Sequence, residues 1–307
     1  MKELWIAAVL LFCSALYSQD RVAAAIDSLP AVKSIDQVAI SPDGSQVAYI
    51  VAGELSVATI SLGTAHRMAA SQNATREVTW SADSHYIAWL NDLPGDKPGS
   101  QLWSAAADGS DLRQRASFEG YAQTPRYAPD DKTISVLYIE GMPRVAGPLQ
   151  PMTPLAGVVG SKIYEQRLTT IDLASNKLMQ VSPADVYVYE YDWLPDSSGW
   201  IGTAAHGPGD NNWWIAQIYT VDIAKGNATS IYKPSLQVAM PRWSPDGKSV
   251  AFIEGLMSDE GSHGGDLCTI SADGSGLTNR TKDRKSSPSS LFWLEPDRIL
   301  FTEFVGG

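Results

Sequence analysis

Only a few residues in this sequence combine a reactive side chain with a suggestive position. Asp259 and Glu260 form an acidic pair in a glycine-rich stretch, and paired carboxylates can hold an amine by charge-assisted hydrogen bonds. Trp213 and Trp214 are adjacent, and either line a binding channel or fold down onto the scaffold. Asp210 belongs to the same segment as the two tryptophans. These five residues are candidates for binding a substrate.

The histidines do not indicate a catalytic or metal centre. There are four, and no two of them are spaced as metal ligands or as part of a catalytic triad. His206 and His263 fall in or beside long connections and could meet on one face, and Arg144 flanks the longest insertion, where it could contact a carboxylate. No Gly-x-Ser-x-Gly nucleophile elbow is present. We therefore predict no catalytic residue, no metal site and no cofactor.

A repeated turn positions these residues. Each copy consists of an aromatic or apolar residue, a turn like Ser-Pro-Asp-Gly and an alternating apolar strand. The copies begin at residues 40, 80, 127, 193, 243 and 293, at intervals of 40, 47, 66, 50 and 50 residues. Four-stranded propeller blades repeat every 40–50 residues or so. The aromatic position is predicted to pack between neighbouring blades; it holds Trp80, Tyr127, Trp193, Trp243 and Trp293.

A second element, strand–turn–strand, lies between the turns at 102–110, 168–176, 218–226 and 267–275, with a weaker copy at 56–63. Each unit therefore contains strands A, B, C and D. The A–B and C–D turns are short, whereas the B–C connections are long: 91–100, 141–162, 206–216 and 255–266. Alternate connections of an antiparallel sheet lie at opposite ends, and long loops on a rigid scaffold often carry function. We expect the face that carries the B–C loops, the B–C face, to be the working face.

These patterns predict an all-β fold, a β-propeller of four-stranded antiparallel blades with five complete repeats and a partial sixth. Residues 20–36 are an N-terminal lead-in and 37–307 the propeller. The sequence ends after strand B of the sixth unit, and a propeller that lacks its closing strands exposes an edge. We expect a truncated piece of a longer reading frame; a short protein closed by another route is the alternative.

Residues 1–19 fit a signal peptide. Lys2 precedes an apolar run from Leu4 to Phe12, which is too short to span a bilayer comfortably. Cleavage is expected between residues 15 and 19. Lipoprotein processing at Cys13 is an alternative, although Phe12 stands where that signal prefers a small residue. The predicted location is exported, either periplasmic or secreted.

The composition excludes several partners. The net charge of −11 and the pI near 4.8 argue against nucleic acid and anionic membrane surfaces, because both require basic patches. After signal removal Cys268 is the remaining cysteine, so no intrachain disulfide is expected. No later segment has the apolar length of a transmembrane helix.

The repeats resemble those of TolB-type propellers and of the N-terminal propeller of prolyl oligopeptidase family serine peptidases, the dipeptidyl peptidase IV and acylaminoacyl-peptidase group. Two loops are similar to those of exported bacterial peptidases of that group: 207–217, with Asp-Asn-Asn-Trp-Trp, and 255–261, with Leu-Met-Ser-Asp-Glu-Gly. The likeness covers most of residues 36–305. It implies a propeller that gates and orients peptides for a C-terminal α/β-hydrolase domain, which this sequence lacks.

On this resemblance the chain is inactive alone, and its partners are a peptide substrate and the missing hydrolase domain. Asp259 and Glu260 would hold the free α-amine of a peptide, as propeller carboxylates do in dipeptidyl peptidases. A TolB-like periplasmic scaffold that binds protein partners is the alternative. A propeller lyase with a metal on its axis is a weaker one, because it needs clustered histidines.

Overall fold

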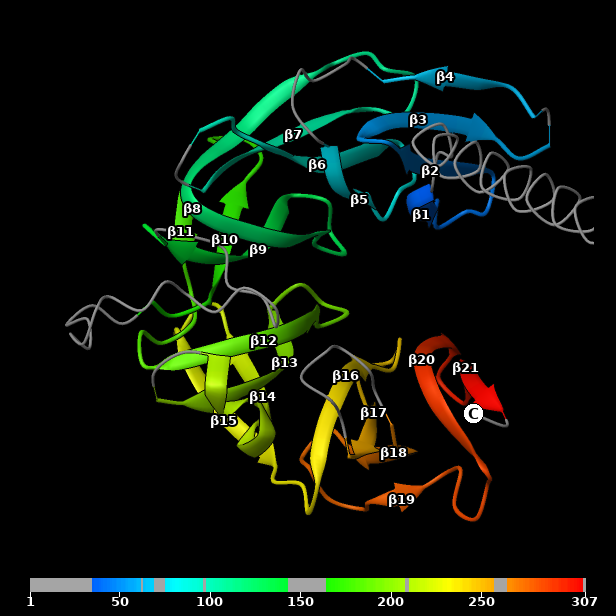
Figure 1. Ribbon diagram of the computed structural model, residues 1–307. Helices are drawn as coiled ribbons and strands as arrows, with labels where there is room; N and C mark the ends of the chain where they lie inside the picture. The colour runs from blue at the N-terminus through cyan, green and yellow to red at the C-terminus, as the bar shows by residue number, and fades with distance from the viewer. Residues whose placement is uncertain are drawn as a thin grey trace, which may run out of the picture.

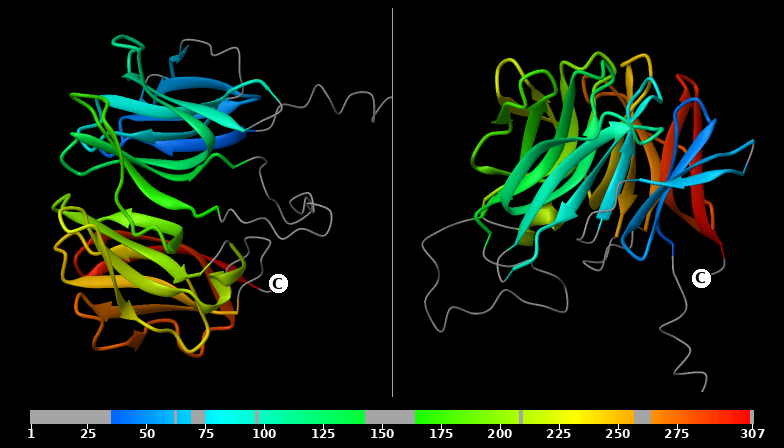
Figure 2. Two further views of the ribbon diagram at one scale, coloured as in Figure 1. Left: turned by 90° about the vertical axis from the view of Figure 1, so that its left-hand side faces the viewer. Right: turned by 90° about the horizontal axis from the view of Figure 1, so that it is seen from above.

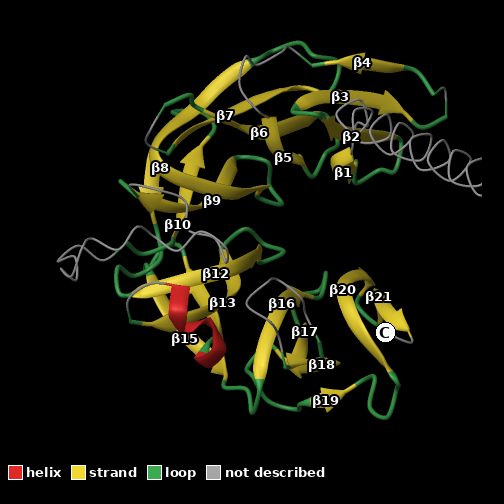
Figure 3. Cartoon of the chain, viewed as in Figure 1, coloured by secondary structure: helices red, strands yellow, loops and turns green. Residues whose placement is uncertain are grey.

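The computed structural model describes residues 35–61, 63–68, 75–95, 98–142, 164–207, 210–256 and 264–305, without the side chains of Asp210 and Asn211. Its sheets follow one another around a centre, as the blades of a propeller do (Figure 1). Nearly every element in these ranges is a strand, and the helix drawn there is the 3-10 helix η2 (Asp210–Ile215) (Figure 3). The predicted all-β propeller is confirmed.

The first blade is a four-stranded antiparallel sheet in chain order. Its strands are β1 (Ile35–Ile40), β2 (Gln46–Val51), β3 (Glu54–Thr59) and β4 (Ala65–Arg67).

The second and third blades are merged into one seven-stranded sheet. Its strands are β5 (Thr75–Trp80), β6 (Tyr86–Asp92), β7 (Gly99–Ala106), β8 (Arg113–Tyr127), β9 (Thr133–Glu140), β10 (Arg167–Asp172) and β11 (Leu178–Gln180). The long strand β8 serves both blades: its first half pairs with β7 as strand D, and its second half pairs with β9 as strand A. The crossover lies at Gly120, where φ is +128° and an added Cβ would lie 2.2 Å from the Ile139 carbonyl oxygen. The repeat pattern did not predict this fusion.

The remaining sheets follow the predicted order (Figure 1). Blade 4 contains β12 (Val186–Trp193), β13 (Gly199–His206), β14 (Gln217–Asp222) and β15 (Asn227–Tyr232). Blade 5 contains β16 (Gln237–Trp243), β17 (Ser249–Gly255), β18 (Asp266–Ser271) and β19 (Thr278–Asn279). The sixth sheet pairs β20 (Ser286–Glu295) with β21 (Arg298–Val305). Blades 1–3 group on one side of the molecule and the later sheets on the other (Figure 2).

The repeated aromatic residues pack between blades, as predicted. Trp80 is 7% exposed, and its indole Nε1 donates to the Ala39 carbonyl of blade 1 at 2.9 Å. Trp293 repeats the contact with the Arg242 carbonyl at 3.0 Å. These two rings therefore pack against the preceding blade and also satisfy their single donors there, whereas the Nε1 of Trp243 is buried without a partner.

The tight turns form a second link between blades. In the first turn, Asp43 accepts from the Ser41 hydroxyl at 2.6 Å and from the Ser45 amide at 3.0 Å. The glycine expected at positive φ is replaced in three turns by Ser84, Asp131 and Ser197, with φ of 64°, 55° and 62°. Each of these side chains accepts from backbone N–H groups of the preceding blade's turn; the Ser84 hydroxyl, for example, accepts from the Asp43 amide at 3.1 Å.

Two sheet faces remain uncovered within the described residues. On β1, Val38 and Ile40 are 52% and 63% exposed. On β20 and β21, Phe292, Leu300 and Phe304 are 57%, 54% and 66% exposed. Blade faces elsewhere in the propeller are buried against a neighbour. These two end faces therefore have the character of blade interfaces without a partner blade.

Candidate functional site

Blade 4 carries the predicted site residues that the structure describes best. Strand β13 ends at His206, and η2 leads from there into β14 while packing against β12, β13 and β16. The turn separates the two tryptophans, because Trp213 is half-buried whereas Trp214 is 62% exposed, as is Ile215. One indole therefore packs on the blade and its neighbour projects from it, and a binding channel lined by Trp214 stays a prediction.

His206 is the last residue of β13, just before the connection that carries Trp214. Its Nδ1 is 3.1 Å from Oδ2 of Asp185, and its ring meets the Tyr219 ring edge-on, with centroids 5.9 Å apart. Its carbonyl accepts from the Asn212 side chain at 3.2 Å, which ties η2 to the strand end. Tyr219 lies beneath, and burial, with the Asp185 charge as a smaller cause, raises the pKa of its hydroxyl.

Asp185 lies in the D–A connection that precedes β12, and sequence reasoning missed it. The B–C and D–A connections share one end of each blade, so this position could have been found from strand order. The pairing Val186↔His206 places the two connections together. We name the group Asp185, His206, Trp214 and Ile215 the blade 4 cluster; it lies on the predicted working face.

Several predicted site residues cannot be placed. Asp259, Glu260, His263 and Arg144 lie outside the described residues, and for Asp210 only the backbone, the first residue of η2, is described. A meeting of His206 with His263 and an amine site at Asp259 and Glu260 therefore stay predictions.

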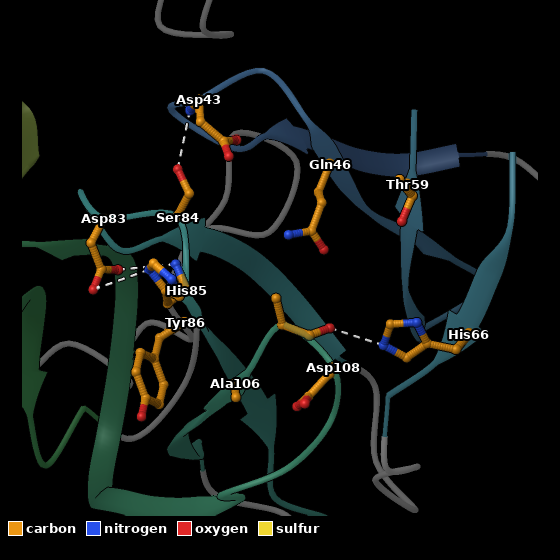
Figure 4. A pocket seen from close by; sticks show the side chains of 11 residues that line it. Asp43, Gln46, Thr59, His66, Asp83, Ser84, His85, Tyr86, Ala106 and Asp108 are labelled. Atoms are coloured by element: carbon orange, nitrogen blue, oxygen red, sulfur yellow. Dashed lines mark hydrogen bonds and ion pairs between the residues drawn. The ribbon is translucent and has the colours of Figure 1, made fainter. Parts of the chain in front are cut away.

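The face opposite the B–C face carries a hollow of about 700 Å³ between blades 1 and 2 (Figure 4). It is lined by polar turn residues, including Asp43, Asp83, Asp108, His66 and His85. Most of their polar atoms have local partners. The Ser41 hydroxyl, together with the Ser45 amide and hydroxyl, lowers the pKa of Asp43 to about 2, and His66 Nε2 lies 2.9 Å from the Ala107 carbonyl. The side chains here chiefly fix turns and join the two blades.

Charged residues also line the inner edge of the propeller, where the A strands of neighbouring blades meet. A hollow of about 370 Å³ is lined there by Gln37, Glu77, Val78, Thr79, Thr124, Pro125 and Arg126. Burial raises the pKa of Glu77, and the Arg76 guanidinium, whose Nη1 lies 2.6 Å from Glu77 Oε1, opposes that rise. Sequence analysis missed this region. One available signal was the residue before the repeated aromatic, which is Arg126, Asp192 and Arg242 in three successive units.

The described residues contain no group of three or more His, Cys, Asp or Glu side chains arranged to hold a metal ion. None of the helices in the described ranges is long and apolar enough to cross a membrane.

Comparison with known proteins places the fold. No family model matches the sequence, and no curated protein matches it either. Among solved structures, the chain is similar to the β-propeller domain of the Trilobed protease from Pyrococcus furiosus (TM-score 0.62, 12% identity, 90% of this chain and 80% of that one). It is also similar to an oligogalacturonate lyase in complex with manganese (TM-score 0.63, 14% identity, 89% and 75%).

A third similar structure is the putative TolB from Agrobacterium tumefaciens (TM-score 0.56, 14% identity, 80% of each chain). At these identities the likeness concerns the fold. The chain therefore has a β-propeller fold of the kind seen in TolB and in the propeller domain of a protease.

Proposed function

We propose that this chain is the non-catalytic, substrate-gating propeller of an exported serine peptidase of the prolyl oligopeptidase family that acts on short peptides. The observation that carries the proposal is the blade 4 cluster, in which an exposed indole and an exposed isoleucine belong to the connection that begins at a histidine–carboxylate pair. The likeness to a protease's propeller domain supports it. The α/β-hydrolase domain would lie outside this chain.

The cluster offers a peptide two kinds of contact. Trp214 and Ile215 present apolar area that a peptide side chain could cover, and covering such a residue stabilises a complex by about 1–2 kcal/mol. The His206–Asp185 pair presents polar atoms at the same end of the blade. The loops with Arg144 and with Asp259 and Glu260, which the sequence predicts on this face too, would add charged contacts to peptide termini. The propeller would thus bind and orient a peptide and leave its cleavage to the hydrolase domain.

The two end faces support the part of the proposal that concerns further strands. The apolar rows on β1 and on β20 and β21 have the chemistry of blade interfaces. A further blade, built from strands that follow β21 in the chain, would pack against both rows and close the ring. The DNA downstream of codon 307 tests this point directly, because an in-frame Gly-x-Ser-x-Gly motif supports the peptidase.

A binding and turnover experiment tests the gating role. Short peptides, measured by calorimetry, are expected to bind the chain, and Trp214→Ala to weaken that binding by about 5- to 30-fold through lost apolar contact. Leu277→Ala is the matched control, since Leu277 is 53% exposed but lies at a C–D turn on the other face. The chain alone should not cleave acyl-peptide or Xaa-Pro chromogenic substrates. Turnover that a serine-directed inhibitor abolishes, or equal binding by both variants, would contradict the proposal.

A second candidate is a TolB-like periplasmic scaffold that binds folded protein partners. The likeness to the Agrobacterium TolB over 80% of each chain favours it. A stop codon after one further closing strand, together with no binding of short peptides, would favour this scaffold over the peptidase.

A further inference from the structure

One repeat position at the inner edge of the propeller is charged in three successive blades only. The residue before the repeated aromatic is Ala39, Thr79 and Phe292 in blades 1, 2 and 6, but Arg126, Asp192 and Arg242 in blades 3, 4 and 5. The A strands of blades 1 to 3 lie next to one another at this edge, and so do those of blades 4 to 6. Between blades 3 and 4, Arg126 Nη1 lies 3.5 Å from Asp192 Oδ1, and the charges of Asp192 and Arg126 both act on Arg242. The two arginines therefore flank one aspartate along an arc.

Arg126 has donors that the protein does not use. Its Nη1 is 3.5 Å from Asp192 Oδ1, at the outer limit of a hydrogen bond, and its Nε is buried without a partner. Its guanidinium lies over the Tyr191 ring, 5.6 Å from the centroid, which holds it in place without satisfying an N–H group. The side chain as a whole is 33% exposed and lines the hollow, so the Nη groups are the donors that a ligand there can reach.

A second cation lies nearby. Burial lowers the pKa of Arg242; the Asp192 charge opposes this, and the charge of Arg126 adds to it. The Nη1 group of Arg242 donates to the Pro241 carbonyl at 2.9 Å. Glu190 is the other carboxylate that acts on Arg242, and its Oε1 already accepts from the Met240 amide at 2.7 Å and from the Thr203 hydroxyl at 3.1 Å.

The hollow beside Arg126 is otherwise internally paired. Glu77 binds Arg76 and accepts from the Thr124 amide, and the Gln37 amide group exchanges two hydrogen bonds with the backbone of Val78. Its volume of about 370 Å³ is within the range of small-ligand pockets. The charged group of this lining that remains to recognise a ligand is the Arg126 guanidinium.

We propose that this axial hollow binds a carboxylate group, which pairs end-on with the two Nη groups of Arg126 in a bidentate geometry that guanidinium groups favour, with Arg242 adding positive charge. Asp192 stays beside both arginines and orients them. The identification of the ligand as the C-terminal carboxylate of a short peptide rests on the function proposed above. A uronate sugar carries the same chemical group and is the other source to be distinguished.

The test measures calorimetric binding of three probes to the full chain: Ala-Ala-Ala with a free C-terminus, its C-terminal amide, and digalacturonate. We expect the free acid to bind at least 10-fold more tightly than the amide, because a charged hydrogen bond contributes about 1.5–3 kcal/mol. Arg126→Gln should remove this preference, and Arg126→Lys should restore only part of it. Arg113→Gln, on the same strand but paired with Asp111 at the surface, is the matched control and should bind as the wild type does. Thermal melts of each variant show that it is folded.

The outcomes separate this inference from the peptidase proposal. Equal affinity for acid and amide, or an unchanged preference in folded Arg126→Gln, overturns the carboxylate site, and peptide binding that depends on Trp214 would still support the gating role. Binding of digalacturonate alone, lost in Arg126→Gln, keeps the carboxylate site and contradicts the peptide role. No binding of any probe overturns the site.

Discussion

The hollow between blades 1 and 2 and the hollow at the inner edge are both lined by charged groups, but their charges are used differently. Around the first, carboxylates such as Asp43 accept from nearby hydroxyl and amide groups, which hold their pKa values low. Beside the second, Arg126 keeps a buried donor without a partner. The comparison teaches that the density of polar residues does not mark a site, and that a charged group without a close partner, at the edge of a hollow, is the better candidate.

Tyr191 supports the inner edge, and its removal should give the largest effect on stability. The residue is fully buried, and its hydroxyl donates to the Thr124 carbonyl at 2.7 Å and lies 2.9 Å from the Ser135 hydroxyl. Tyr191→Ala should lower the free energy of unfolding by about 3–5 kcal/mol, through lost burial and a cavity. Tyr191→Phe keeps the ring and should cost about 1–2 kcal/mol. Urea denaturation measures both; equal losses would mean that the ring contributes little.

Asp43 should make the first hollow sensitive to acid. Its folded pKa of about 2 lies below its usual value of 3.8. A depressed carboxyl pKa contributes stability above pH 3.8, and this contribution is lost as the pH falls toward 2. Asp43→Asn should therefore lower the melting temperature at pH 6. Between pH 5 and pH 2, the melting temperature of this variant should fall by less than that of the wild type. Parallel acid profiles for the two proteins would show that the turn carboxylate is not a net stabiliser.

Arg126 should give the smallest change in stability. Arg126→Met removes the orphaned Nε and a marginal contact to Asp192 but keeps an apolar stem against Tyr191. We expect the free energy of unfolding to change by less than about 1 kcal/mol, while the preference for a carboxylate disappears. A large loss of unfolding free energy, measured by urea denaturation, would assign Arg126 a structural role instead. The charged groups of the two hollows would then serve the same purpose.

Much of the fold could be predicted because turn chemistry is local. An aspartate defines each repeated turn, with a proline before it in five of the six copies, and the spacing of these turns sets the blades. The fusion of blades 2 and 3 could not be predicted in this way, because residues 113–127 carry no tight-turn motif and their pairing on both sides depends on distant strands.

The candidate sites were predicted less completely. The pair Trp213 and Trp214 stood out in the sequence, but which ring is exposed depends on the geometry of η2. Asp185 and Arg126 were missed, although both occupy repeat positions. Whether the Nε of Arg126 has a partner depends on how side chains from two blades pack, and no sequence pattern records that.

The shared strand β8 also limits how this propeller can be rearranged. Blades joined by loops are natural units for duplication, deletion or circular permutation, because a new chain end there breaks no sheet. Between blades 2 and 3 the chain passes from one sheet edge to the next without leaving hydrogen-bonded structure, through the close approach at Gly120. A cut or an insertion at that point would unpair two sheets at once. The pair should therefore be inherited, exchanged and engineered as one module of seven strands.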